Sequence, residues 1–191
     1  MPIVIDIETG GINCNTDALL EIAAFCIKYD KKNKWQVDYT RSWHEHIIPF
    51  HGSNCHAEAL ECNKIIPDHP LRFAIPEKQA LLSLKDKINL WLKESKCKRG
   101  VLVGHNAHFD LNFLMQAVYR CDINKFPLHS FTCFDTATLG GMFFKKTVLA
   151  QIMRQAKIKF DIKKAHGALY DAEKTAELFC YISNIISDKL L

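Results

Sequence analysis

The stretch that decides the fold is Met1-Pro-Ile-Val-Ile-Asp-Ile-Glu-Thr-Gly-Gly11, at the start of the chain. Residues 2–7 are mostly apolar and β-branched, which is typical of a strand buried on both faces. Asp6 and Glu8 lie two residues apart, so both carboxylates point to the same side of that strand. Two negative charges there repel each other and are costly to desolvate. The stretch therefore predicts a divalent cation between Asp6 and Glu8.

The residues directly after the two carboxylates are Thr9, Gly10 and Gly11. We expect them to end the strand and to leave a rim without side chains, where the backbone of a ligand can approach closely. Glycines after a strand also occur in dinucleotide-binding loops, but the G-x-G-x-x-G spacing is absent.

Composition indicates one globular domain, residues 1–191. Hydrophobic residues make up 48% of the chain and charged residues 24%, which is ordinary for a folded domain and argues against disorder. The sequence contains no apolar run of membrane-spanning length, and its first strand begins at Pro2, so we expect neither a membrane anchor nor a signal peptide. Its eight cysteines show no C-x-x-C spacing, so we expect reduced thiols in a cytoplasmic protein. The net charge of +4 does not by itself indicate nucleic acid.

Strand and helix signals continue along the rest of the chain. Strands are predicted at 19–29, 35–48, 100–104 and 131–134, with a polar turn at 30–34 that makes the first two a hairpin. Helices are predicted near 57–60, at 77–93, from about 110 to 120, from 135, at 147–156 and at 169–188. The segment 49–76 is expected to be a loop that borders the site. Hairpin strands followed by strand–helix units predict a mixed α/β sheet with helices on its faces.

Three further residues stand where catalytic groups are expected in such a fold. Asp110 follows the strand at 100–104, at the edge of the sheet where sites form. Asp171 lies early in the last helix, and His166 precedes it by five residues, about 500° around a helix, so the two would point apart if both were helical. Gly167 favours a loop position for His166. We therefore expect Asp171 to be a fixed ligand and His166 a mobile base.

Four carboxylates and one histidine suit two hard cations better than zinc. Oxygen ligands favour Mg²⁺ or Mn²⁺, and two such ions roughly 3.5–4 Å apart stabilise both the attacking and the leaving oxygen of a phosphodiester displacement. A neutral histidine can accept the proton of the attacking water. Each short motif is weak alone, but the motifs in this order, at strand ends and helix starts, favour a catalytic site over a structural one.

The motifs Asp6-x-Glu8, His105-Asn-Ala-x-Phe-Asp110 and His166-x4-Asp171 resemble those of the DEDDh 3′→5′ exonucleases. The resemblance extends over nearly the whole chain to a branch that trims stable RNA. Further matching segments are 6–11, 16–24, 134–136 and 166–180. It implies a ribonuclease H-like five-stranded mixed sheet flanked by helices. It also implies two Mg²⁺ ions, with Mn²⁺ as a substitute, that are held by Asp6, Glu8, Asp110 and Asp171. His166 would be the general base.

The same resemblance implies the substrate and the assembly. It implies a homodimer that trims 3′ ends of tRNA and other stable RNAs, releases nucleoside 5′-monophosphates and also accepts single-stranded DNA. Phe109 and Phe131 match positions whose rings hold the last bases, and Glu58 matches a residue that contacts a terminal base. Ile12 and Cys62 depart from the pattern, because the family has two more stacking phenylalanines there.

A basic run spans residues 93–99. Such a run alone is usually a solvated helix end, but the resemblance assigns Lys93 and Arg99 to a patch that binds RNA entering the partner subunit's active site. Thr9, beside Glu8, is also expected to bind substrate.

Two other functions stay open on the sequence. A catalytically silent RNA-binding module would have lost at least one of the five site residues, and all five are present. A proofreading-type 3′→5′ DNA exonuclease is disfavoured by the matches outside the motifs, but the sequence does not decide between RNA and DNA.

Overall fold

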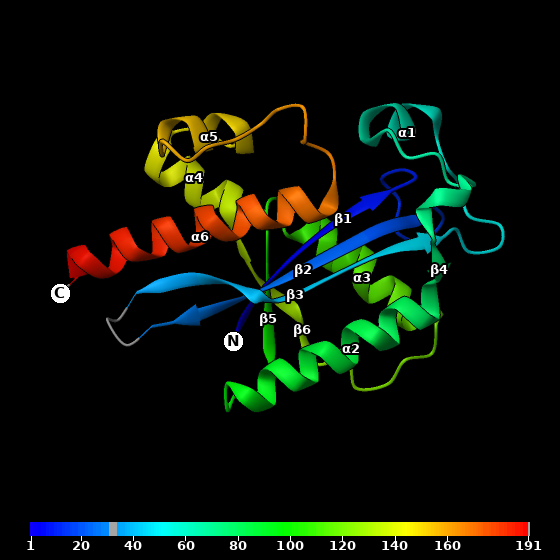
Figure 1. The fold of residues 1–191 in the computed structure, drawn as a ribbon, viewed down its shortest axis with the longest axis horizontal. Coiled ribbons are helices and arrows are strands. Elements are labelled where there is room, and N and C mark those ends of the chain that lie inside the picture. The colour runs from blue at the N-terminus through cyan, green and yellow to red at the C-terminus, as the bar shows by residue number, and fades with distance from the viewer. Residues whose placement is uncertain (31–33, 191) are drawn as a thin grey trace.

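A six-stranded sheet forms the centre of the computed structural model, which describes residues 1–30 and 34–190 (Figure 1). The strands are β1 (Pro2–Thr9), β2 (Leu19–Tyr29), β3 (Trp35–Ile48), β4 (Ile75–Pro76), β5 (Gly100–Gly104) and β6 (Leu128–Asp135). Their order is β4-β3-β2-β1-β5-β6. β1 pairs antiparallel with β2 and parallel with β5, so the mixed α/β sheet is confirmed. The two-residue strand β4, parallel to the end of β3, is the sixth strand that the five-stranded prediction lacks.

The hairpin of β2 and β3 has the predicted bounds. Residues 31–33 of the predicted turn lie outside the described residues. At the edge of that turn, the backbone N–H of Asp30 donates to the carbonyl of Lys34 at 2.8 Å. This long hairpin places β2 and β3 beside β1, where they support the carboxylates of the first strand.

Helices cover both faces of the sheet (Figure 1). α2 (Glu77–Glu94) and α3 (His108–Arg120) pack on one face, and α6 (Ala168–Leu190) packs on the other. The shorter helices are α1 (Ala57–Asn63), the 3₁₀ turn η1 (Pro70–Arg72), α4 (Thr136–Phe144) and α5 (Leu149–Gln155). In the described part of the chain, no helix has both the length and the apolar character that crossing a membrane requires.

The alternation of side chains along β1 separates core from site. Ile3, Ile5 and Ile7 pack with α2 and α3, whereas Val4 packs with α6. Ile3 and Ile5 are fully buried, and burial of one such side chain contributes about 1.5–3 kcal/mol to folding. The isoleucines therefore orient the strand so that Asp6 and Glu8 lie on the α6 side.

Among the predicted boundaries, those of the last strand and of the helix at 147–156 need a physical explanation for their difference from the structure. β6 begins at Leu128, before the predicted start at 131, because its exposed edge-strand residues carry little apolar signal. α5 covers Leu149–Gln155 only, since Val148 at its N-cap is extended. Asp135 ends β6 and caps α4, where its carboxylate accepts hydrogen bonds from the backbone N–H groups of Ala137 and Thr138.

Candidate active site

Three of the predicted carboxylates converge at the end of β1. Asp6 and Glu8 come from the α6 side of β1, and Asp171 comes from the first turn of α6. Oxygen atoms of the three lie within 4.8 Å of one another. The Oδ1 atom of Asp171 is buried and has no hydrogen-bond partner among the described residues. Such a group is costly to leave unpaired, so this oxygen is suited to ligating a cation.

Asp110, the fourth predicted carboxylate, comes from α3, which packs on the face of the sheet opposite to α6. It lies in the first turn of α3, is 4% exposed, and accepts a hydrogen bond from the backbone N–H of Ile7 at 3.1 Å. Gly104 leaves room for it, since a Cβ there would lie 3.1 Å from Asp110 Oδ2. Asp110 is outside the tight group of three, but it lines the same cavity of about 680 Å³ as Asp6, Glu8, Asp171 and His166.

All four carboxyl groups are hard to ionise without a counter-charge. Burial, the largest cause, and the charges of Glu21 and Asp171 together raise the pKa of Glu8 to about 8. Burial raises the pKa of Asp6 well above its usual range, and the neighbouring carboxylates add to this, Asp110 first. Burial likewise raises the pKa of Asp110 and of Asp171, partly offset by the backbone hydrogen bonds that each accepts.

The donor set fits hard divalent cations. None of the four groups forms an ion pair with a lysine or arginine in the described ranges 1–30 and 34–190. All four offer carboxylate oxygens, the ligands that Mg²⁺ and Mn²⁺ prefer. Cations here would offset both the cost of burying these carboxylates and their mutual repulsion, the two causes that raise their pKa values.

His166 lies in the predicted position, in a loop just before α6. Its backbone has a φ of 64°, and Gly167 follows it. The backbone N–H of His166 donates to Asp171 Oδ2 at 2.8 Å, while the side chain is exposed at the cavity. The backbone of His166 therefore holds this residue next to Asp171, while its imidazole stays exposed at the cavity.

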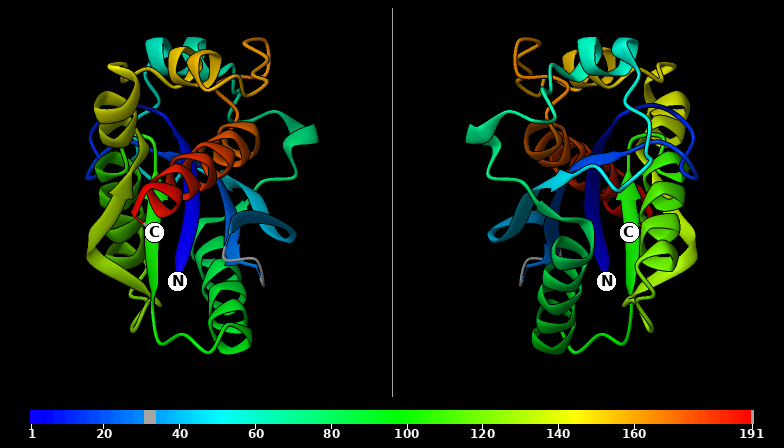
Figure 2. Two further views of the ribbon diagram at one scale, coloured as in Figure 1. Left: turned by 90° about the vertical axis from the view of Figure 1, so that its left-hand side faces the viewer. Right: turned by 90° about the vertical axis from the view of Figure 1, so that its right-hand side faces the viewer.

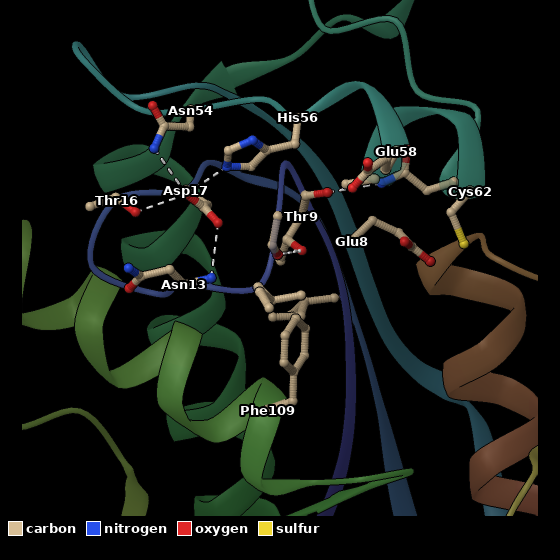
Figure 3. Close-up of a pocket in the computed structure, with 15 residues that line it drawn as sticks. Glu8, Thr9, Asn13, Thr16, Asp17, Asn54, His56, Glu58, Cys62 and Phe109 are labelled. Atoms are coloured by element: carbon tan, nitrogen blue, oxygen red, sulfur yellow. Dashed lines mark hydrogen bonds and ion pairs between the residues drawn. The ribbon is translucent and has the colours of Figure 1, made fainter.

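A second cavity of about 720 Å³ adjoins the carboxylates and is mostly apolar (Figure 3). Glu8 and Phe109 line both cavities. Thr9 and Glu58, two predicted substrate-binding residues, line this one with Phe109. The Thr9 hydroxyl donates to the carbonyl of Gly11 at 2.6 Å, and the ring of Phe109 packs on Phe113. The structure thus brings Thr9, Glu58 and Phe109 together beside Glu8.

The other predicted substrate-binding residues lie elsewhere. Phe131 is on β6, 79% exposed, and its ring contacts only the edge of His129 among the aromatic pairs of the described residues. Lys93 and Arg99 are exposed at and beyond the end of α2, at the opposite end of the molecule from α1 (Figure 1). Within one chain, neither Phe131 nor this basic run lines the two cavities.

The glycine pair ends β1 as predicted, and Gly11 lines the apolar pocket. β1 continues through Thr9, and both glycines are buried by the chain itself. A Cβ at Gly10 would lie 2.5 Å from the carbonyl oxygen of Asn54, and one at Gly11 would collide with the carboxylate of Asp17. The glycines are therefore needed for packing against this segment, and the close approach of a ligand backbone stays a prediction.

Sequence reasoning missed Asp135 as a residue that supports the site. Its Oδ1 accepts hydrogen bonds from the backbone N–H groups of Asn106 at 2.8 Å and Ala107 at 3.4 Å, which holds the loop that leads to Asp110. The available signal is an aspartate at a strand end followed by Thr136, the pattern of a helix N-cap.

A second cluster of side chains with metal-ligating atoms lies across β2 and β3. Glu21 is buried, lies opposite Glu8 on the neighbouring strand, and has His44 Nε2 at 2.6 Å. His46 completes a group with metal-ligand spacing. Arg72 donates to the carbonyl of Leu20 beside this group, and its charge already acts on Glu21. A charged residue inside an otherwise apolar strand is the signal that points to Glu21.

Comparison with known proteins agrees with this geometry. The model of the exonuclease family RNase_T matches residues 3–179. Ribonuclease T of Shewanella oneidensis is 50% identical over 183 residues, which are 96% of this chain and 82% of that one. The branch of the DEDDh exonucleases that the sequence resembles is ribonuclease T, and this resemblance is confirmed.

Solved structures share the fold at low identity. A zinc-bound complex of Escherichia coli exonuclease I with single-stranded DNA has a TM-score of 0.68 and 15% identity, covering 96% of this chain and 40% of that one. A 3′-exonuclease that recognises the histone mRNA stem–loop has a TM-score of 0.68 and 16% identity, covering 98% and 81%. The predicted ribonuclease H-like exonuclease fold is confirmed. The chain therefore belongs to the RNase T family of 3′→5′ exonucleases.

Proposed function

We propose that this exonuclease trims the 3′ ends of tRNA and other stable RNAs, releasing nucleoside 5′-monophosphates, and that it also accepts single-stranded DNA. The observation that carries the proposal is the convergence of Asp6, Glu8 and Asp171 with buried Asp110 at one cavity, beside an apolar pocket of nucleotide size. Ribonuclease T relatives support an RNA substrate, and the exonuclease I complex supports single-stranded DNA.

We propose that Asp6, Glu8, Asp110 and Asp171 hold two Mg²⁺ ions, with Mn²⁺ as a substitute. When bound, such ions supply a Lewis acid and offset negative charge on the reacting phosphate and the leaving 3′ oxygen. The metal-bound form of exonuclease I and the unpartnered Asp171 Oδ1 support this assignment.

The protein's own groups bind the end and move the proton. Thr9, Glu58 and Phe109 bind the terminal nucleotide in the apolar pocket, with the ring of Phe109 as a surface for a base. The imidazole of His166 accepts the proton of the attacking water, and its hydrogen-bonded backbone keeps it next to Asp171.

We propose a homodimer in which Lys93 and Arg99 of one chain bind RNA that enters the partner's site. The support is the position of this basic run at the far end of the molecule from its own carboxylates (Figure 2). Mixing an Asp6→Asn chain with a Lys93→Gln/Arg99→Gln chain should restore activity through hybrid dimers. Absence of rescue, or a monomer in analytical ultracentrifugation, would overturn the proposed dimer.

We also propose that the exposed ring of Phe131 contacts bases upstream of the 3′ end.

We propose that residues 1–191 act as one exonuclease domain in the cytoplasm. The family model spans residues 3–179, which supports the single domain. Every cysteine of the chain lies in the described ranges and is unpaired, which supports a reducing compartment.

A time course on end-labelled tRNA and on single-stranded DNA tests the function. We expect shortening from the 3′ end and release of nucleoside 5′-monophosphates with Mg²⁺ or Mn²⁺, and none with a chelator. The Asp110→Asn chain is the matched control. Undiminished digestion in chelator would overturn the metal assignment, and a clear preference for DNA would favour a proofreading-type enzyme.

A further inference from the structure

A strongly basic surface leads from α4 to His166, apart from the basic run at 93–99. Residues 145–164 contain seven lysines and arginines and a single acidic residue, Asp161. The cations are Lys145, Lys146, Arg154, Lys157, Lys159, Lys163 and Lys164. This segment alone carries +6, whereas the whole chain carries +4, so the rest of the chain is net acidic.

The positive charges of this segment are not used within the fold. All seven side chains are exposed. Within residues 1–30 and 34–190, none of the seven forms an ion pair. Concentrated positive charge without internal partners attracts a polyanion from solution.

The surface is hollowed and continues the active-site cavity. Arg154, Lys157 and Lys159 line a groove of about 720 Å³, together with the apolar side chains of Val148 and Ile162. Val148 also lines the cavity of the carboxylates. Val148 is 53% and Ile162 75% exposed, so bases can pack on them. Single-strand binding tracks combine a positively charged groove with side chains, usually aromatic, on which bases stack, and Phe160 also lines this groove.

A hydrogen bond fixes the groove to the site. His105 follows β5, where the loop to Asp110 begins, and its Nε2 lies 2.8 Å from the carbonyl oxygen of Thr147. Its Nδ1 lies 3.0 Å from the hydroxyl of Thr136 at the start of α4. The basic segment therefore begins in direct contact with the loop that positions a catalytic carboxylate.

The position of the surface determines which part of the substrate it can meet. α5 and the loop after it lie at the same end of the molecule as α1, with the end of β1 between them, whereas the 93–99 run lies at the opposite end (Figures 1 and 2). The pocket of Thr9, Glu58 and Phe109 shares Glu8 with the cavity of the carboxylates, and the basic groove shares Val148 with that cavity.

We propose that the surface of residues 145–164 binds the phosphates of the nucleotides upstream of the 3′ end, in the same subunit whose carboxylates cleave that end. This inference rests on the proposed exonuclease function. With the terminal nucleotide in the apolar pocket, the strand leaves the carboxylates at Val148 and passes Arg154, Lys157 and Lys159. The basic run at 93–99 would then bind the RNA that the partner subunit cleaves, and the groove would bind the RNA that its own subunit cleaves.

The test compares two sets of three charge removals in the Mg²⁺-loaded enzyme. The first variant, called the groove variant, is Arg154→Gln/Lys157→Gln/Lys159→Gln. The matched control is Lys78→Gln/Lys87→Gln/Lys125→Gln, which removes the same charge from exposed positions away from both cavities. For each, kcat/KM is measured on a trinucleotide and a 12-nucleotide RNA between 50 and 200 mM KCl, after circular dichroism confirms folding.

Each lost phosphate contact should reduce the slope of log(kcat/KM) against log[KCl] by about 0.7, so three contacts reduce it by about 2. Between 50 and 200 mM KCl, the unmodified enzyme should then lose about 20-fold more efficiency on the 12-nucleotide RNA than the groove variant. The effect should be smaller on the trinucleotide and absent in the control variant.

Two results would overturn the inference. One is a slope for the groove variant equal to that of the control on both substrates. The other is binding of the surface to phosphatidylserine vesicles with RNA slopes unchanged, which would assign it to a membrane. Failure of the proposed function would look different, because no chain would then hydrolyse either RNA.

Discussion

Replacing Glu8 by Gln should stabilise the metal-free protein above pH 7 while it removes activity. In the folded chain Glu8 lies beside Asp6, Asp171 and Glu21, and burial together with the charges of Glu21 and Asp171 raises its pKa from 4.5 to about 8. Gln has nearly the same shape and no charge. The substitution therefore isolates the electrostatic cost of the site from its packing.

The sign and size follow from linkage. Between pH 4.5 and about 8 the folded state holds a proton on Glu8 that the unfolded state has released. Stability that is fully present below pH 4.5 is therefore lost as the pH rises through the folded-state pKa. At 1.36 kcal/mol for each pH unit, the contribution of this group is on the order of 5 kcal/mol.

Urea unfolding in EDTA, followed by tryptophan fluorescence from pH 5 to pH 8.5, measures the effect. The free energy of unfolding of the unmodified protein should fall by several kcal/mol more than that of Glu8→Gln across this range. Mg²⁺ should raise the free energy of unfolding of the unmodified protein at pH 8.5, and it should raise that of Glu8→Gln less. Glu61→Gln, an exposed site on α1, is the matched control. Parallel pH dependence of all three proteins would refute the reasoning.

Three further substitutions test separate parts of the site. Asp110→Asn keeps the hydrogen bond from Ile7 but removes one ligand charge, so kcat should fall by orders of magnitude with the melting temperature retained; near-normal kcat would contradict the assignment. His166→Ala should keep metal and RNA binding in calorimetry while kcat falls roughly 10²–10⁴-fold, and lost metal binding would make His166 a ligand instead. Ile12→Phe/Cys62→Phe adds two rings to the apolar pocket and should tighten the binding of single-stranded 3′ ends about 5- to 150-fold for each stacked base. An unchanged dissociation constant would show that stacking at these two positions does not limit binding.

Buried regular elements could be predicted from the sequence because their pattern is local. β2 and β5 have the predicted bounds, since continuous apolar runs with turn residues at both ends define them. The shared side of Asp6 and Glu8 followed from strand alternation alone, and the structure confirms it. Loop placement of His166 followed from the glycine behind it.

Features that depend on contacts between distant segments could not be predicted in this way. β4 has two residues and exists only because it pairs with the end of β3. The need for glycine at Gly11 arises from Asp17, which a sequence pattern does not place there. The groove at 145–164 combines exposed cations with a cavity, and only the cations are visible in the sequence.

The central claim is that the four carboxylates hold two catalytic metal ions. Crystals grown with Mn²⁺ and a non-hydrolysable single-stranded 3′ end would show those ions directly by anomalous scattering. We expect two peaks roughly 3.5–4 Å apart, bounded by Asp6, Glu8, Asp110 and Asp171 and in contact with the terminal phosphodiester. Peaks only at Glu21, His44 and His46, or none at the carboxylates with the 3′ end in place, would contradict the account.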